Sequence, residues 1–260
     1  MIAAGCDVGS LTTKAVILNN MRILGQALIK STFDPEKSAA EVMEKALASA
    51  RLSMGDISFC VGTGYGRERI GFVKKTFSEI TCHAKGVHFL HPSIRTIIDV
   101  GGQDCKAIRL DAKGEIEKFI TNDKCASGTG RFLEVMAKLL GVDLEDLGRI
   151  SGQAASPITL AGACTVWAQA EVVVHLNAGR SKADVAAGIN EAMASRIAIL
   201  AKAVGIEKDV CMSGGVAKNA GVVAAMEKQL DLPIRRLKVD PQLMGALGAA
   251  VIAREKAGGR

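Results

Sequence analysis

Several standard markers of protein classes are missing from this sequence. No apolar run approaches the roughly 18 residues that a membrane-spanning helix needs, and residues 1–5 show no basic region followed by an apolar stretch. The chain contains no G-x-x-x-x-G-K-[ST] loop, and no G-x-G-x-x-G follows its first apolar segment. We therefore expect a cytoplasmic protein without a membrane segment, and we disfavour a Walker ATPase and a Rossmann dehydrogenase.

Aromatic residues are also scarce, at 3% of 260 residues, whereas cysteine occurs seven times. An odd number of cysteines without a secretion signal argues against a disulfide framework, and no C-x-x-C pair is present. We expect reduced thiols that are buried, reactive or bound to metal. The net charge of +6 is scattered, and only Arg235, Arg236 and Lys238 form a tight group, so we expect a solvated surface and no nucleic-acid partner.

A strand–turn–strand pattern occurs twice, with the second copy 92 positions after the first. The first copy runs from residue 2 to 18 around Asp7-Val8-Gly9-Ser10, and the second runs from 96 to 110 around Asp99-Val100-Gly101-Gly102. Turn-forming residues follow both copies, at 19–20 and 111–114, where a hairpin needs them. An internal duplication is the economical explanation of this repeat.

The remaining pattern is that of an α/β protein, because short apolar strands alternate with helical periodicity. We expect further strands at 57–61, 210–213 and 234–237, and helices at 38–50, 131–140, 168–177, 183–204, 217–229 and 245–256. Residues 1–92 with a C-terminal helix at about 243–260 are predicted to form a first lobe, and residues 93–242 a second.

The two Asp-x-Gly turns suit the binding of a nucleotide's phosphates. Gly9, Gly101 and Gly102 would let the backbone approach a phosphate and present N–H donors. Asp7 and Asp99 would hold Mg²⁺ through its waters. Hydroxyl groups and one positive charge accompany the first turn, at Ser10, Thr12, Thr13 and Lys14. In the second turn, Asp104 or Gln103 is a candidate to orient an attacking water. A single Asp-x-Gly turn is common in hairpins, so the prediction depends on the repetition.

A third glycine-containing segment, Ser213-Gly214-Gly215-Val216-Ala217-Lys218-Asn219, follows the expected strand at 210–213 and opens a helix. Its glycines would let the backbone lie flat beside an adenosine, and we count Gly214, Gly215, Lys218 and Asn219 as candidate nucleotide contacts. The alternative is a plain strand–helix turn.

These motifs resemble those of the actin, sugar-kinase and heat-shock chaperone ATPase superfamily. Over nearly its whole length the sequence is most similar to the activators, called component A, of 2-hydroxyacyl-CoA dehydratases in the BadF/BadG/BcrA/BcrD ATPase family. ATPase subunits of benzoyl-CoA reductases are close relatives. The resemblance is carried by residues 7–10, 62–67, 98–104, 122–133 and 164–166, and the segment around Cys125 is its most diagnostic part.

The resemblance implies two similar lobes of the ribonuclease H-like type, with mixed sheets flanked by helices and a nucleotide cleft between them. It implies an ATPase coupled to electron transfer, working anaerobically as an oxygen-sensitive homodimer with one 4Fe–4S cluster at its interface. A ferredoxin or flavodoxin would supply a low-potential electron, and an iron–sulfur dehydratase or reductase would receive it. The resemblance also assigns nucleotide contacts to Gly128, Gly130, Glu134 and Gln242.

Cys125 and Cys164 are the cluster ligands that the resemblance implies. A cubane cluster usually takes four thiolates, and two ligands from each of two chains would supply them. From the residues alone, each cysteine could instead be a small buried hydrophobic side chain. That core role is what we expect for Cys6, Cys60, Cys82, Cys105 and Cys211. Trp167 lies close to Cys164 in the sequence, and we expect it to pack in an interface and not to relay electrons.

Three other interpretations of the sequence remain open. Cys82, His83, His88 and His91 cluster in sequence, but their spacing matches no standard zinc motif. A small-molecule kinase of the same superfamily would need no iron and would leave Cys125 and Cys164 without a role. The chain could also be an ATP-binding subunit of a larger benzoyl-CoA reductase complex.

Overall fold

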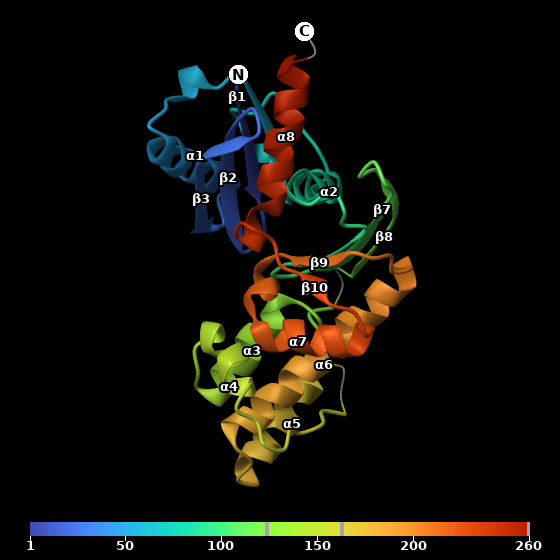
Figure 1. Ribbon diagram of the computed structural model, residues 1–260. Helices are drawn as coiled ribbons and strands as arrows, with labels where there is room; N and C mark the ends of the chain where they lie inside the picture. Colours follow the sequence, from blue (N-terminus) through green and yellow to red (C-terminus); the bar gives the residue numbers. More distant parts are fainter. Residues whose placement is uncertain (123–124, 162–163, 259–260) are drawn as a thin grey trace. The chain divides into compact units, whose positions relative to one another are not determined.

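The computed structural model describes residues 1–122, 125–161 and 164–258, and it divides into two compact units (Figure 1). Unit 1 comprises Met1–Ile94, Leu110–Glu117 and Leu237–Arg260, and unit 2 comprises Arg95–Arg109 and Lys118–Arg236. Residues 110–117 and 237–242 thus belong to unit 1, whereas the expected division assigned them to the second lobe. None of the helices in the described ranges has the length and apolar character that crossing a membrane requires.

Unit 1 contains a five-stranded mixed sheet with the order β3-β2-β1-β4-β5. The central strand β1 pairs antiparallel with β2 and parallel with β4. The strands are β1 Ile2–Val8, β2 Thr12–Asn19, β3 Arg22–Lys30, β4 Phe59–Thr63 and β5 Lys75–Thr76.

Helices cover both faces of this sheet because alternate residues of β1 point to opposite sides. Ala4 and Cys6 pack in one core cluster with α1 (Pro35–Ala50). Ala3 packs in another with α2 (Glu79–Leu90) and α8 (Met244–Gly258). Gly5 lies between Ala4 and Cys6 in β1. A Cβ on Gly5 would collide with the α8 backbone at Ala246 and Ala250, so only glycine allows α8 to lie this close to β1.

Unit 2 repeats the arrangement of unit 1. Its sheet has the order β10-β9-β6-β7-β8, and the central strand β6 pairs antiparallel with β7 and parallel with β9. The strands are β6 Thr96–Val100, β7 Cys105–Leu110, β8 Ile116–Asn122, β9 Val210–Ser213 and β10 Ile234–Arg235. The duplication inferred from the two Asp-x-Gly turns is therefore confirmed at the level of whole sheets.

One large hydrophobic core holds unit 2 together. Ile98 and Met212 from the sheet pack with Met136, Ile189 and Met226 from three different helices, all nearly inaccessible to solvent. The helices are α3 Gly130–Leu140, α4 Leu147–Ser151, α5 Thr165–Asn177, α6 Lys182–Val204 and α7 Ala220–Leu230.

All six predicted helices are present, although their starting points differ by up to three residues. The first begins at Pro35 because Asp34 accepts hydrogen bonds from the Glu36 and Lys37 amides and caps it. The sequence reading missed α2, the short α4, and the strands β3, β5 and β8. Strand β8 is mostly exposed and lies at a sheet edge, so its sequence has no apolar run that would predict a strand.

Candidate functional site

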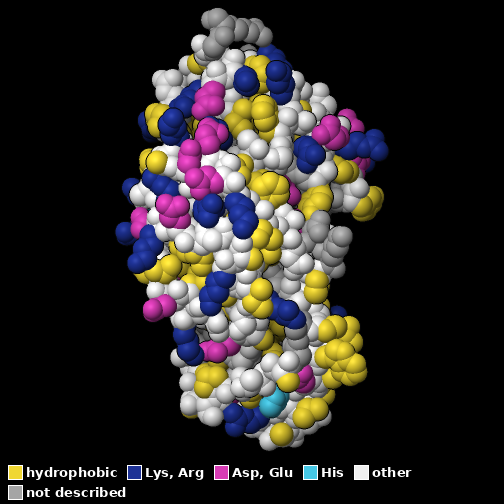
Figure 2. Space-filling view, turned by 90° about the vertical axis from the view of Figure 1, so that its right-hand side faces the viewer, with side chains coloured by type: hydrophobic (Ala, Val, Ile, Leu, Met, Phe, Trp, Pro, Cys, Tyr) yellow, Lys and Arg dark blue, Asp and Glu magenta, His cyan; other side chains and the backbone are white. Residues whose placement is uncertain are grey.

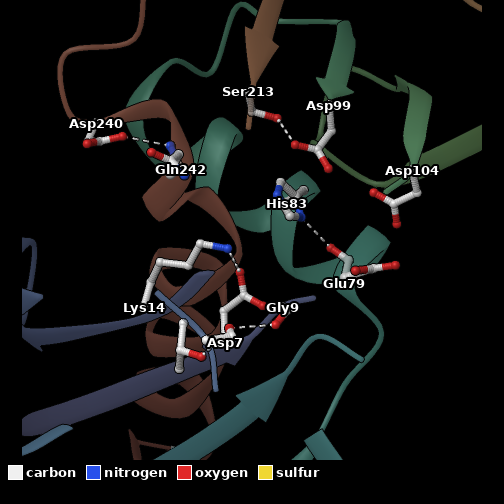
Figure 3. Close-up of polar contacts among 12 residues, drawn as sticks. Asp7, Gly9, Lys14, Glu79, His83, Asp99, Asp104, Ser213, Asp240 and Gln242 are labelled. Carbon is white, nitrogen blue, oxygen red and sulfur yellow. Dashed lines mark hydrogen bonds and ion pairs between the residues drawn. The ribbon is translucent and has the colours of Figure 1, made fainter. Parts of the chain in front are cut away.

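The first Asp-x-Gly turn lies in unit 1, and we call residues 7–14 the first loop. Asp7 lies opposite Lys14 in the β1–β2 ladder, and Lys14 Nζ is 3.2 Å from Asp7 Oδ2 (Figure 3). The Gly9 amide donates to the Thr12 carbonyl (3.1 Å), and the Gly9 carbonyl accepts from the Ser31 hydroxyl (2.8 Å). Asp7 is almost fully buried.

The two hydroxyl residues of the first loop differ in what they can offer a ligand. Thr13 is fully buried and shares a 2.8 Å hydrogen bond with Ser31, so its hydroxyl holds the loop and does not face a ligand. Ser10 is exposed at the tip of the loop, and Thr12 is half-buried. A Cβ on Gly9 would approach Thr12 O to 2.9 Å and Lys14 Nζ to 3.2 Å, so a side chain there would close the space beside the lysine.

The equivalent loop of unit 2, called the second loop (residues 99–106), carries one more charge. Lys106 Nζ lies 2.7 Å from Asp104 Oδ2 and 3.6 Å from Asp99 Oδ2, and all three side chains are almost fully buried. The Ser213 hydroxyl donates to Asp99 Oδ1 at 2.9 Å (Figure 3). The sequence reading missed Lys106, although it follows Asp99 by the same seven positions that separate Lys14 from Asp7.

The N-terminus of α3 holds the second loop from its other side. The amides of Gly130 and Arg131 donate to the carbonyls of Gly101 (2.8 Å) and Gly102 (2.9 Å). A Cβ on Gly130 would lie 3.1 Å from the Gly101 carbonyl oxygen, closer than most Cβ contacts in proteins. The structure therefore brings Gly101, Gly102 and Gly130 together, as the assignment of all three to one site requires.

The third glycine segment begins where β9 ends. Gly214 has φ +82°, and a Cβ there would collide with the Val100 carbonyl and approach Asp99 Oδ1 to 3.0 Å. The segment therefore lies directly against the second loop. Asn219 caps α7, since its Oδ1 accepts from the Gly221 and Val222 amides (2.9 and 3.1 Å).

The other candidate nucleotide residues are distributed over both units. Lys218 and Gln103 are exposed, and Gly215 lies in the short 3-10 turn after Gly214. Glu134, on α3, pairs with Arg131 at 2.7 Å. In unit 1 the backbone amide of Gln242 donates to Asp240 Oδ1 at 2.9 Å (Figure 3). Gly128, with φ +83°, lies against α6.

The seven cysteines fall into two classes. The five expected in the core are buried, and burial raises the pKa of Cys60 and of Cys82 to about 12. Burial likewise raises the pKa of the other three core thiols, Cys6, Cys105 and Cys211. Cys125 and Cys164 are exposed. Because the thiolate is the form that binds metal, the buried five are poorly suited to that role.

The two exposed cysteines both precede helices of unit 2, and α3 packs against α5. Cys164 is the N-cap residue of α5, and its carbonyl accepts from the Ala168 amide. The Thr165 hydroxyl beside it is buried and has no hydrogen-bond partner within the described part of the chain. Cys125 borders a cavity of about 300 Å³ that Ser127 and Arg196 also line. The neighbouring Asp123 and Lys124, part of the diagnostic segment, lie outside the described residues.

Exposed apolar side chains continue along α5 from Cys164. Val166, Trp167, Val173 and Val174 are all exposed, with Trp167 at 69% and Val166 at 68%. Their spacing of one, seven and eight positions places them on one helix face, which we call the α5 stripe. In the space-filling view, apolar side chains gather in a protruding group at the lower right, on the unit that carries α5 (Figure 2). Elsewhere on this face, charges of both signs are interspersed (Figure 2).

Metal binding can be tested against these donor sets. Throughout 1–122, 125–161 and 164–258, no group of three or more His, Cys, Asp and Glu side chains is arranged to hold a metal ion. Mg²⁺ rarely needs such a group, because it keeps waters and takes one or two carboxylates plus phosphate oxygens, and Asp7 and Asp99 offer carboxylates of that kind. Cys125 and Cys164 supply two exposed thiols per chain, which fits a cluster shared between two chains.

The two repeated sheets, each with its helices, define the class of protein: an actin-like ATPase or sugar-kinase fold. A ROK family glucokinase from Streptomyces griseus, with 12% identity, has a TM-score of 0.62 over 98% of this chain and 100% of that one. That likeness concerns the fold alone.

Closer comparisons narrow the class to one family. The BadF/BadG/BcrA/BcrD ATPase family matches residues 4–253, and the chain belongs to it. An activator of lactoyl-CoA dehydratase from Anaerotignum propionicum is 46% identical over 257 residues, covering 99% of both proteins.

Two solved structures with similar sequences have almost the same fold. The activator of the 2-hydroxyisocaproyl-CoA dehydratase from Clostridium difficile with bound ADPNP has a TM-score of 0.95 at 42% identity, over 99% of this chain and 96% of that one. Component A of the Acidaminococcus fermentans (R)-2-hydroxyglutaryl-CoA dehydratase has a TM-score of 0.96 at 40% identity, over 99% of each chain.

Proposed function

We propose that this protein is an ATP-dependent activator that passes a low-potential electron to a partner iron–sulfur enzyme, a 2-hydroxyacyl-CoA dehydratase or a related reductase. A ferredoxin or flavodoxin would deliver the electron to a 4Fe–4S cluster shared by two copies of the chain, and the cluster would pass it to the partner. We expect this reaction in the cytoplasm. Membership of the ATPase family supports the use of ATP. The names of relatives that activate lactoyl-CoA and 2-hydroxyisocaproyl-CoA dehydratases support the class of partner.

The nucleotide role rests on the two loops. Asp7 and Asp99 would each face the magnesium ion of the bound nucleotide through its waters, while Lys14 and the glycine backbone would face the phosphates. Asp104 or Gln103 would orient an attacking water. The nucleotide can drive a change of conformation only if it binds one arrangement of the lobes, 1–92 with 243–260 and 93–242, more tightly than another.

The observation that carries the electron-transfer part of the proposal is the exposure of Cys125 and Cys164. The other five cysteines are buried, with raised pKa values, so these two are the thiols that a metal centre could reach. A bound cluster would supply one-electron chemistry at low potential. Cys164 and Cys125 would hold it, and the first amides of α5, which carry partial positive charge, would stabilise its negative charge.

The α5 stripe supports a homodimer. Apolar side chains as exposed as Trp167 and Val166 are costly in water unless another surface covers them. The stripe starts two residues after Cys164, so an interface built around a shared cluster would cover it. A two-fold axis through the cluster would give each chain the same surface in contact.

Anaerobic purification followed by measurement of iron and of the visible spectrum tests the proposal. We expect a brown protein with about two irons per chain, because four irons are shared by two chains. Sedimentation should give a dimer. A protein that stays colourless and iron-free after reconstitution with iron and sulfide would contradict electron transfer, and a kinase-like activity of the same fold would then take its place. Purification as one subunit of a larger reductase would favour the benzoyl-CoA reductase alternative, which a 33% identical relative from Thauera aromatica suggests.

A further inference from the structure

The carboxylate of Asp7 is enclosed by residues from three separate segments of unit 1. A Cβ on Gly64 would approach Asp7 Oδ1 to 2.5 Å, and a Cβ on Gly245 would approach Asp7 Oδ2 to 2.7 Å. The Gly245 Cβ would also meet His83 Cε1 at 3.2 Å. The imidazole of His83 and the carboxylate of Asp7 therefore border the same small space beside Gly245.

The His83 ring is held firmly in this place. His83 is only 6% exposed, and its Nδ1 lies 2.9 Å from the Glu79 carbonyl oxygen on the preceding turn of α2. A carbonyl oxygen can only accept, so Nδ1 carries a proton and the ring orientation is fixed. Helix α2 is fixed in turn, because Gly86 and Gly248 let the backbones of α2 and α8 touch.

The matching aspartate of unit 2 is oriented in a different way. Asp99 lies beside Ser213 in the β6–β9 ladder and accepts a 2.9 Å hydrogen bond from its hydroxyl. Thr63 has the corresponding place beside Asp7 in the β1–β4 ladder. Its hydroxyl donates to the Phe77 carbonyl instead, at 3.0 Å. In unit 1, the neighbouring strand thus directs its hydroxyl elsewhere, and a buried histidine stands beside the carboxylate.

We propose that His83 is a positioning residue for Asp7, which its buried ring confines by contact on the side where no strand hydroxyl donates to the carboxylate. The ring edge would keep the Asp7 carboxylate turned toward Lys14 and the first loop, the orientation in which it can meet the waters of a nucleotide-bound magnesium ion. This inference rests on the proposed role of Asp7. It assigns His83 no contact with the nucleotide.

Two substitutions separate the ring edge from the hydrogen bond to Glu79. His83→Asn keeps a donor near the position of Nδ1 and removes the far edge of the ring. His83→Gln reaches further and restores bulk near Asp7. The readout is the affinity for N-methylanthraniloyl-ADP with and without Mg²⁺, together with kcat and KM for ATP hydrolysis. For His83→Asn we expect the magnesium-dependent gain in affinity and kcat to fall about tenfold to a hundredfold, as for other residues behind a metal ligand, with a smaller change in KM. His83→Gln should recover part of both.

His88→Asn is the matched control. His88 lies on the same helix, but its ring packs against Gly114, so this variant should match the parent protein in every readout. Equal losses in His83→Asn and His88→Asn, or a parental magnesium response and kcat in His83→Asn, would overturn the inference alone. A parent protein whose ADP affinity ignores Mg²⁺ would overturn the role of Asp7 as well. Thermal melting of each variant identifies losses that come from unfolding, and a folded His83→Gln without any recovery would also count against the ring edge.

Discussion

Asp7 and Asp99 have the same position in two sheets of the same strand order. Each aspartate lies opposite a lysine in an antiparallel ladder, Lys14 or Lys106, and beside a hydroxyl residue in a parallel one, Thr63 or Ser213. The copies have diverged in charge. The loop carbonyl that accepts from Gly9 belongs to Thr12, whereas the one that accepts from Gly101 belongs to Asp104, a second carboxylate for Lys106. The two loops therefore share one architecture but offer a ligand different chemistry.

The first prediction concerns Asp7→Ala. Removing this carboxylate takes away a magnesium contact of the proposed site, so ATP hydrolysis should fall by roughly a hundredfold or more. The melting temperature should also fall, because Lys14, whose side chain is only 12% exposed, loses its carboxylate partner, but the protein should still fold. Steady-state phosphate release and thermal unfolding would measure the two effects. Normal turnover in a folded Asp7→Ala protein would remove Asp7 from the site.

A second prediction uses two glycines that both have a positive φ. Gly214 has φ +82° with ψ 178°, a region almost restricted to glycine, and Gly179 has φ +76°, so alanine is strained at both positions. An added Cβ meets nothing within 4 Å at Gly179, but at Gly214 it collides with the Val100 carbonyl. Gly214→Ala should therefore lose about 1–3 kcal/mol more stability than Gly179→Ala in urea unfolding. Equal losses would mean that the close approach at Gly214 is unimportant.

Much of this fold could be predicted from short-range patterns. The repeat of Asp-x-Gly turns indicated the duplicated sheet. The odd number of cysteines without a secretion signal indicated free thiols. The return of the C-terminal helix to the first lobe was also predicted, but the residues that meet there were not. Gly245 and His83 are 162 positions apart and both lie beside Asp7. Asn219 shows a different limit, since a helix cap and a nucleotide contact call for the same residue type in the same place.

The third prediction is a loss of stability at high pH that comes from the buried thiols. In the folded state burial raises the pKa of Cys60 and of Cys82 from 9.0 to about 12. Below pH 9 both states are protonated and the full stability is present. Above it the unfolded chain releases protons first, so each thiol should reduce the free energy of unfolding by about 1.4 kcal/mol per pH unit until about pH 12. A Cys60→Ala/Cys82→Ala variant should show a shallower decline, and an identical slope in both proteins would contradict this account.

A fourth prediction tests the α5 stripe. If the dimer covers Trp167, then Trp167→Ala should weaken association about tenfold to a hundredfold, as expected when a large aromatic side chain is removed from an interface. Sedimentation equilibrium over a range of concentrations would measure the change. Phe33→Ala is a suitable control, since Phe33 is a fully exposed aromatic residue on unit 1. Dimers of equal strength in the parent and Trp167→Ala proteins would place the interface elsewhere.

The last prediction concerns Cys125 and Cys164 together. Each chain would supply two of four thiolates, so a single substitution removes two ligands from the dimer at once. Cys125→Ser or Cys164→Ser should therefore lose most of the iron and weaken the dimer, because the group that joins the chains is no longer held. Nucleotide binding should survive, since the two loops lie in other segments of the chain.

Cys60→Ser is the matched control for these two variants. Cys60 is buried in β4, so serine should cost some stability but leave the iron content and the dimer as in the parent protein. Iron per chain and sedimentation can be measured on all three variants under anaerobic conditions. Full iron in the Cys125→Ser and Cys164→Ser proteins, with loss in Cys60→Ser, would mean that the wrong cysteines have been assigned. Loss of iron with an unchanged dimer would mean instead that the α5 stripe, and not the cluster, holds the two chains together.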